Sequence, residues 1–197
     1  MIANILHLIV YSLMSLFLVI VILRFLLQVV RADFYNPVSQ AIVKVTMPLL
    51  KPLRKIIPGV LGIDMASVVL IILVQLVASM ILVLVVGESE LLGNPLILIA
   101  WGVVGTLTIV SSIFFWCMII SIIGSFIAPF SHHPLLVLAN QIINPLAAPI
   151  RKLIPPLGGV LDVSPIFILI ILQVVNILLE RLALLLGLIP VVVLGNW

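Results

Sequence analysis

The stretch from Asn36 to Asp64, NPVSQAIVKVTMPLLKPLRKIIPGVLGID, determines how the rest of this chain is interpreted. It is the only long interval of the first half that is not uniformly apolar, and it recurs at residues 133–162 as HPLLVLANQIINPLAAPIRKLIPPLGGVLD. Prolines and an Arg-Lys pair of the first copy recur in the second copy at one constant distance along the sequence. After the last matched proline, the second copy has one extra residue, so the later matches are displaced by one position. The matched pairs are Pro37 and Pro134, Pro48 and Pro145, Pro52 and Pro149, Arg54 and Arg151, Lys55 and Lys152, Pro58 and Pro155, Asp64 and Asp162, and Gln75 and Gln173. Spacing this regular predicts an internal duplication.

The composition is that of an integral membrane protein. Hydrophobic residues make up 65% of the chain and charged residues only 8%, whereas a soluble domain carries about 25% charged residues. The mean hydropathy is +1.54. Most basic residues flank apolar segments, where membrane topology explains them, so we expect no nucleic-acid partner. The single cysteine, Cys117, excludes an intrachain disulfide.

The apolar runs predict an all-α membrane protein with four transmembrane helices in two parallel-related repeats. We assign the first repeat to residues 1–95 and the second to residues 96–197. The expected spans are residues 5–30, 65–87, 102–128 and 165–187. The run that begins at residue 96 exceeds one bilayer thickness, so it is either a tilted helix or an interfacial piece followed by a span. The 182–197 tail either spans the membrane or lies at its surface.

Between the two spans of each repeat lies a Pro/basic segment, residues 36–64 and 133–162. Apolar residues at helical spacing predict an interfacial helix, and a shallow re-entrant loop is the alternative. Pro48 and Pro52 are expected to end or kink the helix, and Pro58-Gly59 marks a turn. Asp64 and Asp162 directly precede the following spans, so both are expected to cap those helices.

The basic residues predict the orientation. Both Pro/basic segments are basic, whereas the connection at residues 88–94 contains no lysine or arginine. By the positive-inside rule, both segments face the cytoplasm and both termini lie on the periplasmic side.

Three polar residues end the first span. Arg24, Gln28 and Arg31 are three to four residues apart and would share one helix face. They either extend to the head groups or find a partner inside the bundle. In the second repeat Ser121, Ser125 and Ala128 take their places, so the repeats diverge here.

The stretch DFYNPVSQAIVKVTMPLLKPLRKIIP followed by GID resembles the bacterial YggT family, whose members carry two YGGT repeats. The resemblance covers nearly the whole chain and implies a four-span inner-membrane protein with a cytoplasmic Pro/basic motif in each half. It further implies a link to osmotic and ionic stress tolerance. Chloroplast relatives resemble assembly factors for haem attachment in a cytochrome complex, and Gram-positive relatives lie near division genes. The second copy departs from the family pattern at Ala147-Ala148 and at Leu161, which looks inserted.

No catalytic or metal-binding constellation is expected. His132 and His133 are adjacent and would point in different directions on a helix, and no serine has an accompanying base. Residues that either set topology alone or contact anionic lipid or a partner are Lys51, Arg54, Lys55, Arg151 and Lys152. Gln75 and Gln173 are expected to hydrogen-bond between helices across the pseudo-twofold axis, with a polar permeation route as the alternative.

These observations give two functional hypotheses, neither of which needs a cofactor. The first is a non-enzymatic scaffold or assembly and osmotic-stress factor that acts through lipids or a membrane protein partner. The second is a channel or transporter subunit for ions or osmolytes, which would require a homo-oligomer because four helices offer little pore lining.

Overall fold

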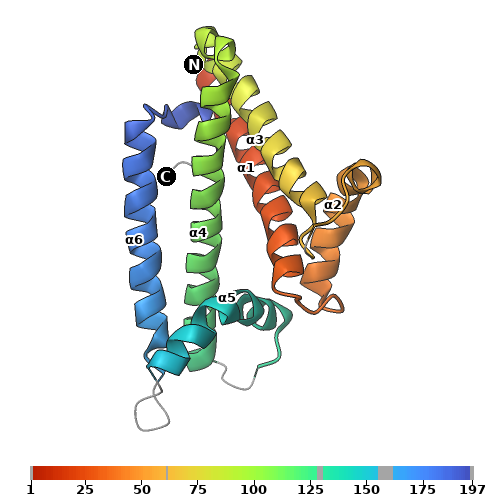
Figure 1. Ribbon diagram of the computed structural model, residues 1–197, viewed down its shortest axis with the longest axis vertical. Coiled ribbons are helices and arrows are strands. Elements are labelled where there is room, and N and C mark those ends of the chain that lie inside the picture. Colours follow the sequence, from red (N-terminus) through yellow and green to blue (C-terminus); the bar gives the residue numbers. More distant parts are fainter. Residues whose placement is uncertain (1, 61, 128–130, 155–161, 196–197) are drawn as a thin grey trace.

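Six α-helices and two 3-10 helices follow one another in the computed structural model, which describes residues 2–60, 62–127, 131–154 and 162–195 (Figure 1). In chain order they are α1 (Ile2–Val29), α2 (Pro37–Ile56), α3 (Met65–Val86), η1 (Ser89–Gly93), α4 (Pro95–Ile127), α5 (Pro134–Leu153), α6 (Ser164–Leu185) and η2 (Pro190–Val192). Four of them, α1, α3, α4 and α6, are long and apolar enough to cross a membrane. The all-helical, four-span prediction is therefore confirmed.

The halves have the same order of elements: a span, a shorter helix and a returning span. Figure 1 shows α1 and α4 running in one direction, with α3 and α6 returning in the other. The helices α1 and α3 pack together, α4 packs on α6, and α3 meets α4 where the halves join. This arrangement confirms two repeats related in parallel, as expected when each repeat contains two spans.

The helix α4 is continuous over 33 residues, which corresponds to about 50 Å. Of the two alternatives for the run that begins at residue 96, the structure therefore shows one long helix rather than an interfacial piece followed by a span. Because α4 is longer than the hydrocarbon core of about 30 Å, it must tilt or extend beyond that core.

The Pro/basic segments form the helices α2 and α5, each 20 residues long. Each begins with a proline, and the residue before it accepts a hydrogen bond from a backbone amide of the first turn. Asn36 Oδ1 accepts from Val38 N at 2.9 Å, and His133 Nδ1 accepts from Leu135 N at 3.3 Å. Proline fits this first position because its missing amide proton would have no intrahelical acceptor.

Pro48 and Pro52 lie inside α2, so the expectation that they end the helix is wrong. The helix continues because the two prolines are one turn apart on an exposed face. The carbonyls that lose a donor, those of Lys44 and Pro48, lie on that same exposed side and can be solvated.

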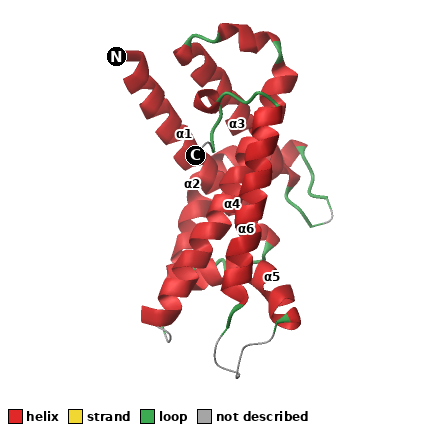
Figure 2. Cartoon of the chain, turned by 90° about the vertical axis from the view of Figure 1, so that its left-hand side faces the viewer, coloured by secondary structure: helices red, strands yellow, loops and turns green. Residues whose placement is uncertain are grey.

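The chain after α6 returns into the bundle (Figure 2). Gly187, with φ +60°, ends α6, and Leu188 N donates to Ala183 O at 2.9 Å in a Schellman motif. Val193 and Leu194 are then buried, and η2 packs on α3. Residues 182–185 thus complete α6, and the described chain after them packs into the bundle through buried residues 192–194, while Pro190 and Val191 are exposed. Trp197 lies outside the described residues.

Residues of α1 and α4 receive this returning tail. His7 Nε2 lies 2.7 Å from Val191 O, and Trp101 Nε1 donates to Leu186 O at 3.0 Å. A Cβ atom on Gly105 would lie 2.2 Å from Leu194 O, so only glycine allows this close approach. Among the glycines of α4, Gly105 thus admits the C-terminal segment, whereas Gly102 lies against Gln75 of α3 and Gly124 against Leu136 of α5.

Candidate functional site

The two Pro/basic segments meet at one end of the bundle, where α1 and α4 end (Figure 1). Asn36 Nδ2 donates to Pro134 O at 2.7 Å, and Asp33 N donates to Gln141 Oε1 at 3.1 Å. Residues 98 to 108 positions apart in the chain are therefore joined into one polar layer. The predicted segments lie side by side, and they form the first part of the candidate site.

In the first copy, the arginine of the motif is tied to the aspartate that precedes α3. Arg54 forms an ion pair with Asp64, and Arg54 Nε lies 3.1 Å from Asp64 Oδ2. Ser67 Oγ donates to the same oxygen at 2.7 Å. Burial alone would raise the pKa of Asp64, but the hydrogen bonds from Arg54 and Ser67 outweigh it and hold that pKa below its ordinary value.

The second copy repeats this pair in a more exposed setting. Arg151 Nε donates to Asp162 Oδ2 at 2.8 Å, and Ser164 N donates to Asp162 Oδ1 at 2.9 Å. Burial raises the pKa of Asp162, but the hydrogen bonds from Ser164 and Arg151 hold it below its ordinary value. Asp162 thus accepts a first-turn amide of α6, as a capping residue does. Asp64 occupies the N-cap position of α3, but its carboxylate makes no side-chain capping hydrogen bond and instead accepts from Arg54 and Ser67 Oγ, so the expected cap by this carboxylate is wrong.

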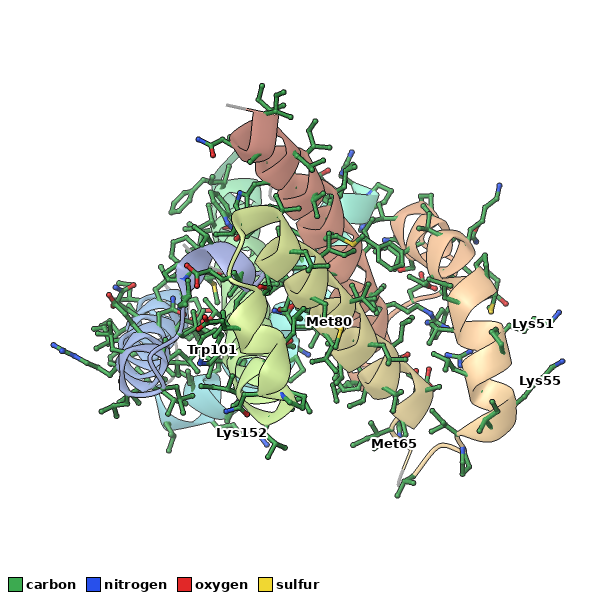
Figure 3. The ribbon with its side chains drawn as sticks, turned by 90° about the horizontal axis from the view of Figure 1, so that it is seen from above. Lys51, Lys55, Met65, Met80, Trp101 and Lys152 are labelled. Atoms are coloured by element: carbon green, nitrogen blue, oxygen red, sulfur yellow. The ribbon has the colours of Figure 1, made fainter. Side chains whose placement is uncertain are left out.

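The lysines of the candidate set behave differently from the arginines. Lys51, Lys55 and Lys152 are exposed and make no ion pair within the described residues. Figure 3 shows Lys51 and Lys55 pointing outward from α2, away from the bundle. The five basic residues therefore divide into two internally paired arginines and three lysines that remain available to the surroundings.

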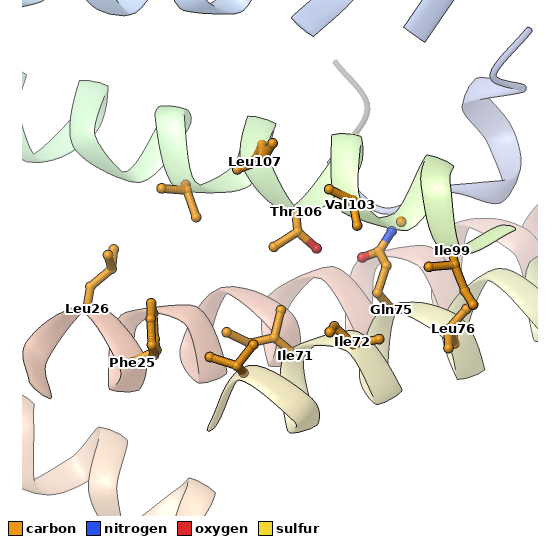
Figure 4. A pocket seen from close by; sticks show the side chains of 13 residues that line it. Phe25, Leu26, Ile71, Ile72, Gln75, Leu76, Ile99, Val103, Thr106 and Leu107 are labelled. Atoms are coloured by element: carbon orange, nitrogen blue, oxygen red, sulfur yellow. The ribbon is translucent and has the colours of Figure 1, made fainter. Parts of the chain in front are cut away.

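The two glutamines do not pair. Gln75 is 1% exposed, and its Nε2 donates to Leu194 O at 3.2 Å, whereas Gln173 is exposed on α6. The predicted hydrogen bond across a pseudo-twofold axis is therefore wrong, because the C-terminal tail takes the place of the second helix. Figure 4 shows Gln75 at the wall of a groove of about 310 Å³ between α3 and α4, whose lining is otherwise almost entirely apolar.

The polar residues at the end of α1 also separate. Arg24 is 5% exposed, and its guanidinium carbon lies 5.5 Å from the centre of the Phe34 ring. Arg31 follows α1, with φ +52°, and is exposed, so it does not join Arg24 and Gln28, which share one face and line one cavity. Arg24 is therefore buried in the bundle with the Phe34 ring beside it, but the expected polar partner for its Nη1 atom is not found among the described residues.

Two contacting residues, Phe34 and Ser67, were not singled out from the sequence. Ser67 lies three residues after Asp64 in the first turn of α3, and that spacing could have identified it. Phe34 lies in the connection after α1, where no periodicity places a side chain. Pro155, one of the eight expected motif prolines, lies outside the described residues, whereas the other seven fall within α2, α5 or the turn after α2.

The histidines are used structurally. His7 contacts the tail and His133 caps α5, while His132 is exposed. Among the described residues, no group of three or more His, Cys, Asp or Glu side chains is placed to hold a metal ion.

Comparison with known proteins agrees with this architecture. The CCB3/YggT family pattern matches residues 3–85 and 100–183, one segment in each repeat. An uncharacterised protein of Pseudomonas aeruginosa is 49% identical over 164 residues, which is 83% of this chain and 82% of that protein. An uncharacterised protein of Vibrio alginolyticus is 36% identical over 85% of this chain and 89% of its own length. A protein of Escherichia coli K12 named YggT, also uncharacterised, is 33% identical over 84% of each chain.

No solved structure matches the chain. The family pattern covers both halves, and the four membrane-length helices occur in the order that the duplication requires. The chain belongs to the CCB3/YggT family of membrane proteins.

Proposed function

We propose that this protein is a non-enzymatic scaffold of the bacterial inner membrane, acting in assembly or osmotic-stress tolerance through anionic lipids or a membrane protein at its Pro/basic face. The outward-pointing lysines carry the proposal. Lys51, Lys55 and Lys152 have no ion-pair partner among the described residues, although two aspartates lie in the same segments and pair with arginines. Basic side chains near an anionic membrane surface contribute about 1 kcal/mol each to binding.

The outer surface of α2 suits an interface. Val45, Leu49 and Ile56 are exposed on the same helix as Lys51 and Lys55. A helix that exposes both apolar and basic side chains lies in the plane of the membrane surface with its lysine heads in the polar layer. The positive-inside rule then places the α2 and α5 end in the cytoplasm, and the termini in the periplasm.

The structure indicates which residues to change in a test. Replacing Arg54 or Arg151 would break an ion pair as well as remove a surface charge, so the three lysines are the cleaner targets. We expect Lys51→Gln, Lys55→Gln and Lys152→Gln together to leave insertion and thermal stability unchanged but to abolish hyperosmotic protection in a strain that lacks the native gene.

A variant with arginine at the same three positions is the matched control, because it retains the charge and should protect normally. Full protection by the correctly inserted glutamine variant would contradict the proposal. Loss of protection by both variants would also contradict it, since charge would then not be the property that matters.

A transport function is the second candidate, and the outer face of α6 favours it. Gln173, Asn176 and Glu180 are spaced by three and four residues and so share one helix face. Gln173 is exposed, and the Oδ1 atom of Asn176 has no partner among the described residues. Polar groups in hydrocarbon are unfavourable, and α6 of a second copy would cover them.

Disulfide cross-linking separates this candidate from the scaffold. Gln173→Cys in a Cys117→Ser background should cross-link in membranes if α6 lines an oligomer axis, whereas Ile171→Cys, on another face, should not. Cross-linking at residue 173 together with ion flux in liposomes would support transport. A monomer in native mass spectrometry and the absence of flux would exclude it.

A further inference from the structure

We propose that the cavity between α1, α2 and the turn before α3 binds one phosphodiester anion, the group that a phospholipid head group carries. This site is distinct from the lysine face and does not depend on the proposed function. The cavity measures about 610 Å³, and its polar lining includes Arg24, Gln28, Arg54 and Asp64.

Arg24 carries the argument because it is buried and forms no ion pair with any described residue. Its side chain is 5% exposed, and its Nη1 atom has no hydrogen-bond partner among the described residues. The Phe34 ring stacks against one side of it but accepts no conventional hydrogen bond. A buried guanidinium with an unpaired donor is strongly unfavourable unless an anion completes it. Arginine also binds phosphate oxygens in a planar, bidentate manner.

The charges of the cavity select a monoanion. Asp64 pairs with Arg54 and also accepts from Ser67, so its charge is already compensated. Two arginines and one aspartate leave a net charge of +1 (2 − 1 = +1) in the lining. A phosphodiester carries a single negative charge and neutralises this site, whereas a phosphate dianion would leave it negative.

The depth of the cavity matches the head-group layer. The helix α1 has 28 residues and is therefore about 42 Å long, close to the full thickness of a bilayer with its polar regions. Arg24 lies about 8 Å from the end of that helix at Val29, near the boundary between hydrocarbon and head groups.

A second unpartnered atom indicates which head group fits. Gln28 Oε1 is buried without a donor, so it would accept a hydrogen bond from a hydroxyl group. The glycerol hydroxyls of phosphatidylglycerol provide such a donor beside a phosphodiester, whereas the choline group of phosphatidylcholine has none. We therefore infer an anionic, hydroxyl-bearing lipid as the occupant.

The second repeat provides an internal comparison. It has the Arg151–Asp162 pair, but Ser121 and Ser125 stand where Arg24 and Gln28 stand in the first repeat. Without the second cation, its charge is balanced. Only one high-affinity site per chain is expected among the described residues.

The test uses the delipidated full-length protein in detergent, titrated separately with dioleoylphosphatidylglycerol, dioleoylphosphatidylcholine and inorganic phosphate. Native mass spectrometry counts the bound molecules, and thermal unfolding is the second measurement. We expect one phosphatidylglycerol per chain, bound about ten- to hundredfold more weakly by Arg24→Gln. Arg31→Gln removes the same charge at an exposed position nearby, and Arg151→Gln breaks the corresponding ion pair; both should bind normally.

Thermal unfolding separates binding from misfolding. Without lipid, Arg24→Gln should be at least as stable as the native protein, because the unpaired buried charge has gone, and phosphatidylglycerol should stabilise only the native protein. Arg24→Lys retains the charge without the planar fork and should bind the lipid more weakly while folding normally.

Stabilisation by inorganic phosphate, with no response to phosphatidylglycerol, would overturn the phosphodiester assignment and indicate a site for a soluble anion instead. Equal phosphatidylglycerol binding by the native protein and Arg24→Gln would overturn the site, as would an equal loss in Arg31→Gln. The triple lysine-to-glutamine variant should retain this binding, so failure of the lysine-face proposal and failure of this site give different results.

Discussion

Each repeat has an Arg–Asp ion pair at the same place in its sequence. The repeats differ at both ends of their first spans. Near the Pro/basic end, α1 has Arg24 where α4 has Ser121. At the other end, α4 has Gly105 where α1 has Leu8, which is exposed. The first repeat therefore holds a buried cation, and the second holds a surface against which backbone can pack.

Both repeats have the same connection between the Pro/basic helix and the returning span, whereas they differ in what their other polar residues contact. The Arg54–Asp64 and Arg151–Asp162 pairs both join that helix to the start of the next span. Gln75 and Gln173 correspond in sequence, but only Gln75 is buried, because the tail packs beside it.

The largest expected difference between the repeats is in the contribution of their ion pairs to stability. Asp64→Asn should lower the free energy of unfolding by roughly 2–3 kcal/mol, because Asp64 is 7% exposed and its loss leaves Arg54 without its ion-pair partner beside the buried Arg24. Asp162→Asn should cost less than about 1 kcal/mol, since that pair is more exposed. Equilibrium unfolding in mixed detergent micelles measures both, and equal losses would refute the distinction between a buried and an exposed pair.

The second largest effect is expected at Gly105, towards the end of α4 that lies away from the Pro/basic helices. Gly105→Ala should destabilise the protein by about 1–2 kcal/mol, because the new Cβ would overlap Leu194 O and Val193 Cγ1. Gly93→Ala is the control, since a Cβ there meets nothing within 4 Å. Labelling of Leu194→Cys, in a Cys117→Ser background, should become faster with Gly105→Ala and stay slow with Gly93→Ala. Unchanged labelling would mean that the tail does not depend on this glycine.

The sequence predicted the architecture well because its evidence was local and repeated. The apolar runs predicted four spans, and the offset between the prolines predicted two parallel repeats. Boundaries agreed to within a few residues except at α4, where Leu96 to Ala100 continue the helix rather than form a separate piece. Helix α2 continues past Pro48 because solvent can satisfy the carbonyls on its exposed face.

The sequence predicted the site less well because its contacts are non-local. From the sequence, Arg54 and Arg151 are expected to set topology or contact lipid or a partner, and no periodicity shows that each pairs with an aspartate ten or eleven residues later. The return of the tail depended on the contact between Leu194 and Gly105, which are far apart in the chain. Arg24 was assigned two positions, and only the packing of Phe34 distinguished them.

The glutamines allow a smaller test of the same comparison. Gln75→Leu removes the hydrogen bond to Leu194 O and should cost about 0.6 kcal/mol, the average for such bonds in membrane proteins. Gln173→Leu should leave the stability of the monomer unchanged, because that side chain is exposed. Thermal unfolding of both variants in the same detergent measures the two changes in stability. A greater loss with Gln173→Leu would indicate that α6 is covered by a partner.

The smallest effect is expected in the response to pH near neutrality. The pKa values of Asp64 and Asp162 lie below the ordinary value of 3.8 in the folded protein. The unfolded chain therefore binds more protons in acid, and stability rises with pH through this region. Above pH 3.8 the contribution of both carboxylates is present, so thermal unfolding at pH 7 and pH 5 should not differ through them.

This contribution to stability is lost as the pH falls below 3.8 through the depressed pKa values of the two carboxyl groups. Asp64→Asn should reduce that acid-dependent loss more than Asp162→Asn, because Asp64 is the more buried of the two. An acid transition of equal size in both variants would show that the two pairs contribute alike, contrary to the difference in their burial.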